Sequence, residues 1–506
     1  MSGWRMAFGP GIHDAEAESA EGEELRLQLS DVRKLARRTQ RLIVGVARAA
    51  DRVTFARLIR EHLGTDRSSV DVVEETWPSY DHVNVQVGLD AWLEGPGRTH
   101  TLVGVANFRH REFDLSDLMR SSEPMHYGGL TPGNVARLNL PVGPSGEVRA
   151  CVVCAVYLVS QGERRAVLLL RLGRSDMGES ATRLEIAADD PDFAATIAAE
   201  VRESALEHNI YRGQVVSFGR DMFGERHTVL SFHHRPTMTL EDLILPAETV
   251  DAITRQVVGV ARHRTQLLAA GQHLKRGLLL YGPPGVGKTH TVRYLTSQLT
   301  ETTIVLLAGD TLHLIGAACS VARTLQPAMI VVEDVDLIAE DRDMYEGSSP
   351  VLFQLLNEMD GLAEDADVVF LLTTNRADLL EPALAERPGR VDQAVALEKP
   401  DREARRRLFA LYRGALDVDE SRLDSVLSRT DGVTASFLKE LLRRAAVRAA
   451  EATPEGGEAS GSLSVSADQL DAALDELLDT RNAMTRVLLG GQRSSGMTGP
   501  TGLGIQ

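Results

Sequence analysis

The sequence is poor in cysteine and has no long apolar run. Three cysteines in 506 residues are too few for a disulfide framework and are typical of a reducing compartment. The longest apolar stretch, Ala150–Val159, is shorter than the roughly 18 residues that a membrane-spanning helix needs. The first residues also lack the hydrophobic core of a signal peptide. We therefore predict a cytoplasmic protein with no membrane span.

Two further kinds of chemistry have little support. Cys151 and Cys154 form a lone C-x-x-C, and no second Cys or His pair stands at the spacing of a zinc site. On a strand their side chains point to opposite faces, so we interpret them as small buried residues. The net charge of −17 argues against nucleic acid as a partner, because binding to phosphates draws on clustered Lys and Arg.

The N-terminal part begins with an acidic, polar segment at residues 1–22, whose composition is typical of disorder. Apolar residues at helical spacing predict a helical segment over residues 23–65. Five basic residues fall on one face of it, namely Arg33, Lys34, Arg37, Arg38 and Arg41. That face is either solvated and balanced by nearby acids, which we prefer, or a docking surface for an acidic partner or nucleic acid.

Residues 66–220 have the pattern of an α+β domain, to which we assign recognition of a substrate or adaptor. A period of two predicts a strand over Val83–Leu93. Further predicted elements are strands at 102–106, 148–159 and 165–172, a turn at 160–163 and a helix at 192–208. A linker is expected at 221–240, in which His233 and His234 are interpreted as connecting residues, not metal ligands.

A glycine-rich loop follows three consecutive leucines that predict a buried strand. It has the spacing G-x-x-x-x-G-K-T, and a helix is expected to begin near Lys288. Such a loop lets backbone N–H groups approach phosphate oxygens, and the helix N-terminus adds a positive dipole end. Lys288 is expected to neutralise the β and γ phosphates, and the hydroxyl of Thr289 to hold Mg²⁺. The predicted nucleotide-binding residues are Gly282, Pro283, Pro284, Gly285, Val286, Gly287, Lys288, Thr289 and His290.

Two later strand patterns end in polar residues. Residues 328–332 lead into Glu333 and Asp334, and residues 368–374 lead into Asn375. Carboxylates at the carboxyl end of a parallel strand, beside a phosphate loop, are placed to hold Mg²⁺ and to orient a water. The amide of Asn375 can bond a phosphate or that water. A glycine-rich turn without a ligand is the alternative, and these residues argue against it.

Residues 235–490 resemble an AAA+ ATPase module, of the branch that contains the FtsH-type, proteasomal and katanin-type ATPases. The motifs that carry the resemblance are Gly-Pro-Pro-Gly-Val-Gly-Lys-Thr from Gly282, Leu-Leu-Asn-Glu-Met-Asp-Gly-Leu from Leu355, Thr-Thr-Asn-Arg ending at Arg376, and Arg-Pro-Gly-Arg from Arg387. The resemblance implies an α/β fold: a P-loop module with a parallel sheet at 241–400 and a helical lid at 401–490, after an N-terminal helical and α+β domain. A disordered tail is expected at 491–506.

The resemblance also implies the roles of individual residues. Asn375 matches the sensor-1 position, and Arg387 and Arg390 match arginines that act on the γ phosphate of a neighbouring protomer. An arginine of this kind accelerates hydrolysis by roughly 10³ to 10⁵. The expected assembly is therefore a homo-oligomer, a hexamer by resemblance, with Glu333, Asp334, Asn375, Arg387 and Arg390 as catalytic residues, ATP as substrate, and Mg²⁺ held by Thr289 and Glu333.

Several positions depart from the family pattern. Glu333–Asp334 reverses the usual Asp–Glu order, so that Glu333 is expected to contact Mg²⁺ and Asp334 to polarise water. Leu314 stands where a substrate-gripping aromatic is usual, and it is either a weaker grip or ordinary packing. Ala435–Ser436 puts no charge at the sensor-2 position, one extra residue precedes Arg387, and no H-E-x-x-H protease motif occurs.

Two functions are therefore carried forward. The first is a ring-forming Mg-ATP hydrolase that remodels or translocates a protein partner recognised by the N-terminal domain. The second is an ATP-gated assembly switch or scaffold, with slow hydrolysis and no threading. The set of Asn375, Arg387 and Arg390 favours the first, whereas Leu314 and the reversed carboxylates favour the second. The sequence does not name the substrate.

Overall fold

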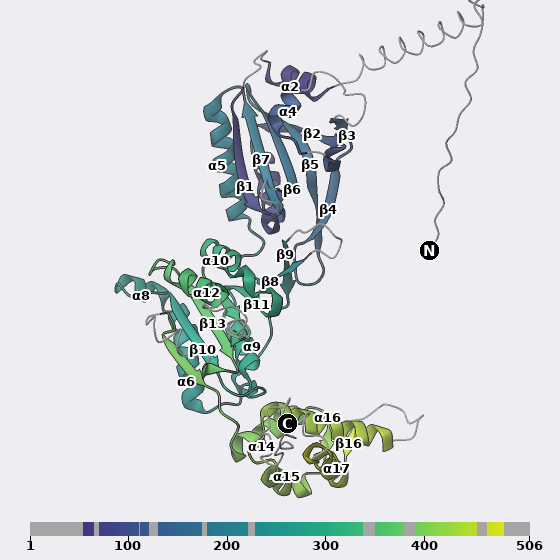
Figure 1. Ribbon diagram of the computed structural model, residues 1–506, viewed down its shortest axis with the longest axis vertical. Coiled ribbons are helices and arrows are strands. Elements are labelled where there is room, and N and C mark those ends of the chain that lie inside the picture. Colours follow the sequence, from purple (N-terminus) through teal and green to yellow (C-terminus); the bar gives the residue numbers. More distant parts are fainter. Residues whose placement is uncertain are drawn as a thin grey trace, which may run out of the picture.

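The computed structural model shows two β-sheet domains and a helical lid, which follow one another along the chain (Figure 1). It describes residues 54–64, 70–110, 112–120, 130–174, 180–220, 228–336, 350–378, 390–452 and 463–479. The predictions for residues 1–22 and 491–506, and for the basic face at Arg33–Arg41, lie outside these residues. No helix within the described ranges is long and apolar enough to cross a membrane.

The N-terminal domain is an antiparallel sheet with helices on both faces, in agreement with the predicted α+β class (Figure 1). The strand order is β1-β7-β6-β5-β2-β3, and β4 pairs with β5. The strands are β1 Val72–Pro78, β2 Arg98–Ala106, β3 Thr131–Gly133, β4 Ala136–Pro141, β5 Val148–Gln161, β6 Arg164–Arg174 and β7 Ser180–Ala188. The predicted strands at 102–106, 148–159 and 165–172 are thereby confirmed.

Four helices cover this sheet. Helices α3 (His82–Leu93) and α5 (Pro191–Glu207) pack over one face, and α2 (Phe55–Leu63) and α4 (Leu115–Arg120) pack over the other. The predicted helix at 192–208 is α5, which begins after the cap Asp190. Cys151 and Cys154 are both buried in β5 and belong to different cores, as their interpretation as small buried residues requires.

The strand predicted over Val83–Leu93 is wrong, because these residues form helix α3. The alternating polar residues looked solvent-facing, but they are buried and hydrogen-bonded. Gln86 Oε1 accepts from the backbone N–H of Val152 at 3.0 Å, and Asn84 Oδ1 accepts from that of Ile210 at 2.9 Å. A helix that is buried around most of its surface shows no 3.6-residue hydrophobic period, so the alternation of apolar and polar residues indicated a strand where a helix forms.

The second domain is the predicted parallel sheet, with strand order β14-β10-β13-β12-β11-β8-β9. Neighbouring strands of this sheet pair in parallel, except that β9 pairs with β8 in antiparallel orientation. The strands are β8 Val215–Arg220, β9 Thr228–His233, β10 Arg276–Tyr281, β11 Thr303–Leu307, β12 Ala328–Val332, β13 Val368–Thr374 and β14 Gln393–Ala396. A parallel sheet gathers the carboxyl ends of its strands at one edge, where the phosphate loop lies.

Strands β8 and β9 differ from the predicted domain boundary. The sequence assigns residues 215–220 to the N-terminal domain and 221–240 to a linker. In the structure β8 pairs with β11, with Val215 opposite Ile304, so both strands belong to the second sheet. His233 is the last residue of β9, with Nε2 2.7 Å from Ser217 Oγ, so it is a strand residue and not the connecting residue that the sequence predicted.

Helices cover both faces of the second sheet. On one face lie α6 (Ala247–Thr254), a π-helical turn (Arg255–Gly259) and α9 (Lys288–Gln298). On the other lie α10 (Ile315–Thr324) and α12 (Pro350–Asp360). After the π-helical turn the chain continues as α7 (Val260–Arg262) and α8 (Arg264–Ala269).

The two sheet domains share a hydrophobic core. Tyr80 and Val83 of the N-terminal domain belong to the same buried cluster as α10 and the adjacent strands. Tyr211 Oη donates a hydrogen bond to the carbonyl of Tyr80 at 2.6 Å, and the rings of Tyr80 and Phe218 meet edge-on at 5.4 Å. These contacts join the N-terminal domain to the second domain.

The lid is helical, as predicted (Figure 1). It consists of α14 Arg402–Arg413, α15 Leu423–Arg429, α16 Ala435–Ala452 and α17 Ala467–Leu478, with the short parallel strands β15 Asp417–Val418 and β16 Ser464–Val465. The apolar face of α16 is buried in the lid core. Ser466 caps α17 in a capping box with Gln469.

Candidate nucleotide-binding site

The glycine-rich loop connects β10 to α9, and close approaches of other residues require glycine at two of its positions. Gly282 has φ +148°, and a Cβ there would lie 2.2 Å from the carbonyl oxygen of Leu397. Gly285 has φ +80°, and its Cβ would lie 2.8 Å from Ser436 Oγ. Val286 is buried beneath the loop, whereas Pro284 is exposed. The loop is therefore a narrow, side-chain-poor cradle at the N-terminus of α9, as a phosphate site requires.

Lys288 is 7% exposed and is folded back over this loop. Its Nζ donates to the carbonyl oxygens of Gly282 (2.8 Å) and Pro283 (3.0 Å) and to Asn375 Oδ1 (2.8 Å). Burial lowers the pKa of Lys288, while the charges of Asp334 and Asp336 act to raise it. A lysine ammonium has three donors, and all three are used here within the chain.

The carboxylates predicted at the end of β12 lie beside Lys288. Asn375 bridges the two groups, because its Nδ2 donates to Asp334 Oδ1 at 3.1 Å while its Oδ1 accepts from Lys288. Asp334 has φ +52° and is exposed, and its backbone N–H donates to Thr373 Oγ1 at 3.1 Å. The structure thus brings Lys288, Asp334 and Asn375 together, as the strand-end pattern indicated.

Glu333 and Thr289 have the chemistry to hold Mg²⁺. Glu333 Oε1 is buried and has no hydrogen-bond partner among the described residues, and Thr289 is exposed at the first turn of α9. A buried carboxylate oxygen without a donor is favourable only if a cation or a proton satisfies it. Within the described ranges no group of three or more His, Cys, Asp and Glu residues forms a metal site. Mg²⁺ typically takes only one or two protein ligands beside phosphate oxygens and water, so the residues fit this ion.

His290 faces away from the phosphate cradle. Its Nε2 lies 3.0 Å from the carbonyl oxygen of Asp242, in the segment before α6. Asp242 also closes a capping box with Thr239. His290 therefore ties α9 to the segment before α6.

The lid touches the phosphate loop directly. The backbone N–H of Ser436 donates to the carbonyl oxygen of Gly285 at 3.2 Å, and Ser436 Oγ does so at 3.4 Å. The sequence marked Ala435–Ser436 only as a sensor-2 position without charge, and this backbone contact has no residue-type signal that could have predicted it.

Arg387 and Arg390 are the two arginines that the sequence predicts to act on a neighbouring protomer. Arg387 lies outside the described residues. Arg390 is 8% exposed and forms a two-pronged ion pair with Asp360, in which Nε lies 2.7 Å from Oδ1. Within this chain Arg390 is thus held by α12, away from the chain's own phosphate loop. Its action on a neighbouring protomer stays a prediction.

The segment that aligns with the substrate-gripping loop is packed against the core. Ile315 is 1% exposed and begins α10, and Leu314 ends the preceding 3₁₀ helix, partly buried against the same core. Of the two alternatives for Leu314, the structure favours ordinary packing.

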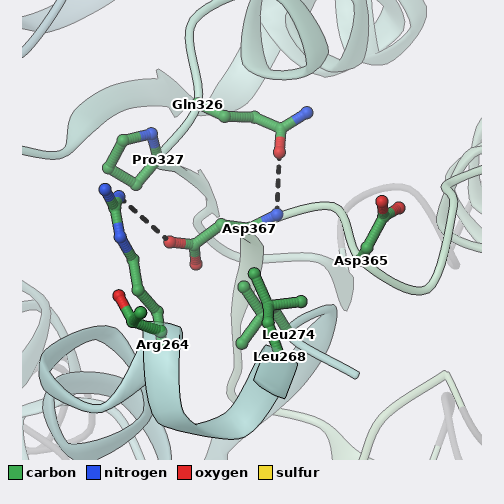
Figure 2. A pocket seen from close by; sticks show the side chains of 8 residues that line it. Arg264, Leu268, Leu274, Gln326, Pro327, Asp365 and Asp367 are labelled. Carbon is green, nitrogen blue, oxygen red and sulfur yellow. Dashed lines mark hydrogen bonds and ion pairs between the residues drawn. The ribbon is translucent and has the colours of Figure 1, made fainter. Parts of the chain in front are cut away.

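A separate pocket of about 350 Å³ lies near the amino ends of the strands of the second sheet (Figure 2). Asp367 precedes β13 and Pro327 precedes β12, so the pocket borders the amino ends of these strands. Figure 2 shows Arg264 reaching toward Asp367, with an ion-pair distance of 3.9 Å. The glycine-rich loop and the strand-end carboxylates lie after the carboxyl ends of β10 and β12, at the other end of the strands. This pocket is therefore not part of the candidate nucleotide site.

Known proteins were compared with the chain. Residues 278–399 match the family described as "ATPase family associated with various cellular activities (AAA)". An ATP-dependent zinc metalloprotease FtsH 2 of Sphaerobacter thermophilus is 35% identical over 225 residues, which cover 42% of this chain and 34% of the relative. A second protease of that organism, FtsH 4, is 30% identical over 299 residues, 54% of this chain and 44% of the relative.

A proteasome-activating nucleotidase 1 of Haloferax volcanii is 31% identical over 209 residues, which cover 38% of this chain and 51% of that protein. The chain thus spans from about a third to about half of the length of these relatives.

Proposed function

Because residues 278–399 form an AAA ATPase domain, we propose that the chain hydrolyses Mg-ATP in a homo-oligomeric ring and uses the energy to remodel a protein partner. The observation that carries this proposal is the contact of Asn375 with both Lys288 and Asp334. It supports the proposal because Lys288, the amide of Asn375 and the carboxylate of Asp334 form one hydrogen-bonded group at the carboxyl ends of the strands, where parallel sheets bind nucleotides.

This geometry supports a proposed role for each residue of the site. The backbone of the loop and Lys288 bind the β and γ phosphates, and Thr289 and Glu333 would hold Mg²⁺, which supplies neutralisation of phosphate charge. Lys288 must exchange at least one of its three acceptors for a phosphate oxygen. Asp334, exposed beside the loop, orients the attacking water as general base, and Asn375 holds Asp334 in place.

The remaining part of the proposal concerns the neighbouring protomer. Arg387 and Arg390 complete the site of the next subunit, by resemblance to the family, and a hexamer is the proposed ring. The shared core of the two sheet domains supports a direct mechanical link between the ATPase domain and an N-terminal domain that recognises the partner. A cytoplasmic location stays a prediction.

A second candidate has one observation in its favour. The segment that aligns with the substrate-gripping loop has Leu314 and Ile315 in place of an aromatic residue, Ile315 is buried at the start of α10, and Leu314 packs on the core. This favours an ATP-gated assembly switch, in which ATP binding builds the ring and slow hydrolysis releases a partner without threading.

One experiment separates the two. ATP turnover would be measured over a series of protein concentrations for wild type, Arg387→Ala and Asp334→Asn, with Arg407→Ala on the exposed side of α14 as control. A ring ATPase predicts turnover per subunit that rises cooperatively with concentration and falls by about 10³ or more in Arg387→Ala.

The opposite result is equally informative. Assembly would be followed by analytical ultracentrifugation with ATP, ADP and no nucleotide. If ATP drives assembly while wild type turns over no faster than the variants, the hydrolysis-driven motor is excluded and the switch is supported.

A further inference from the structure

Asp336 is a buried carboxylate that lies two residues beyond Asp334 and has no role in the site described so far. It is 7% exposed. Its Oδ1 accepts two hydrogen bonds, from Thr374 Oγ1 at 2.9 Å and from the backbone N–H of Asn375 at 3.2 Å. Asp336 therefore connects the chain after β12 with the last residue of β13 and the residue that follows.

These bonds hold Asn375 on its backbone side. Thr374 Oγ1, which donates to Asp336, also accepts from the backbone N–H of Arg376 at 2.9 Å. The residues on both sides of Asn375 are thus tied through one hydroxyl to one carboxylate. The side chain of Asn375 is left to reach Lys288 and Asp334.

We propose that Asp336 is the positioning residue for Asn375, and that it acts as a hydrogen-bond acceptor through Oδ1. It holds the Asn375 backbone so that its amide lies between Lys288 and Asp334. This inference rests on the proposed function, because it assigns a role in the same site. A displacement of about 1 Å in a catalytic group can cost about 10²-fold in rate, so a fixed backbone at this position matters.

A role for the negative charge of Asp336 is the competing explanation. The charge lies near Lys288, and an aspartate can also serve as a metal ligand. The two explanations differ in a testable way, because both hydrogen bonds reach the same oxygen. Asn carries a carbonyl oxygen at the position of Oδ1, so Asp336→Asn removes the charge and keeps the acceptor. Asp336→Ala removes both.

The test combines a structural and a kinetic measurement. Hydrogen–deuterium exchange of the nucleotide-free protein would be followed in peptides that contain the amide of Asn375. The same preparations would give kcat and KM for ATP. The variants are Asp336→Asn, Asp336→Ala and Thr374→Val, with Asp365→Ala at an exposed position as a matched control.

We expect Asp336→Ala to speed exchange at Asn375 and to lower kcat about 10²-fold, while KM for ATP changes little. Asp336→Asn is expected to keep exchange protection and kcat close to wild type. Thr374→Val removes one of the two donors and should give an intermediate loss. Should Asp336→Ala fail to fold in a thermal unfolding scan, Thr374→Val and Asp336→Asn still decide the question.

Two outcomes would overturn the inference. The first is an equal loss of kcat in Asp336→Asn and Asp336→Ala with unchanged exchange, which would assign the charge, not the acceptor. The second is wild-type exchange and kcat in Asp336→Ala. A wild type without ATP turnover would refute the proposed function instead, and the exchange measurement would still report whether Asp336 holds Asn375.

Discussion

Asn375 Oδ1 accepts a hydrogen bond from Lys288 Nζ at 2.8 Å, so the glycine-rich loop and the end of β13 are joined directly. The lysine proposed to bind phosphate and the proposed sensor amide therefore share one contact. Nucleotide must compete for this contact, because the other two donors of the ammonium group are also occupied.

Replacement of Asn375 by Ala frees both Lys288 and Asp334. We expect kcat for ATP to fall by about 10² to 10³, the loss typical of one oriented polar group in an active site. ATP binding should weaken much less, because the backbone of the loop and Lys288 remain. Steady-state turnover with fluorescent-nucleotide titration measures both quantities, and a loss confined to binding would contradict the assigned role. Arg407→Ala serves as the control.

Replacement of Gly285 by Ala should disrupt the cradle and the lid contact together. The positive φ costs about 1–2 kcal/mol for a residue with a Cβ, and the new methyl group would press on Ser436. Gly162→Ala is the matched control, because Gly162 has φ +63° with open space around its Cβ. We expect both variants to lose stability in thermal unfolding and only Gly285→Ala to lose ATP affinity. Equal ATP affinity in the two variants would show that the lid contact is unimportant.

Replacement of Asp360 by Ala leaves the guanidinium of Arg390 without its partner. Arg390 is buried, whereas the side chain of Asp360 is 51% exposed, so solvent reduces the cost below that of a fully buried pair. We expect a loss of about 1 kcal/mol in the free energy of unfolding, measured by urea denaturation. Arg443→Ala, which breaks an exposed pair with Glu440, should cost less. An equal cost in both would mean that burial of Arg390 adds nothing.

Asp81, the residue before α3, should make the free energy of unfolding depend on pH. Burial raises its pKa to about 6, above the usual 3.8, so the folded state favours the protonated acid. The resulting stabilisation is complete below about pH 4 and is lost as pH rises through about 6. Because part of the residue is exposed, we expect a difference of about 1–2 kcal/mol, less than the full two-unit value. Asp81→Asn should remove this dependence while its amide oxygen still accepts from Asn84. Urea denaturation from pH 4 to 7 measures it, and parallel curves for both proteins would contradict the assignment.

The nucleotide site was predictable because its signals are local in sequence. The signals of the loop at 282–289 and of the carboxylates after β12 are residue type and spacing, and the structure brings Lys288, Asp334 and Asn375 into contact. A short apolar strand followed by a glycine-rich turn can be recognised from its own residues, because the conformation of the turn depends on its glycines and not on distant contacts.

The features that could not be predicted depend on partners far away in the chain. Polar residues of helix α3 are buried by hydrogen bonds to β5 and to the segment after α5. Strand β8 pairs with β11, which lies almost ninety positions later in the chain. Arg390 carries no sign in sequence that it pairs with Asp360. In each case contacts between distant parts of the chain determine the structure, and neither secondary-structure propensity nor hydrophobic periodicity contains information about those contacts.

The attachment of β8 to β11 bears on how the protein can be divided. A fragment that begins after the predicted linker, near residue 241, would leave β11 as an unpaired sheet edge with its hydrogen-bonding groups open to other chains. Such edges promote aggregation, so the smallest well-behaved fragment that contains the second domain must start before Val215. The N-terminal domain therefore cannot be removed by a cut in the predicted linker, because the chain that connects it to the second domain is itself part of the second sheet.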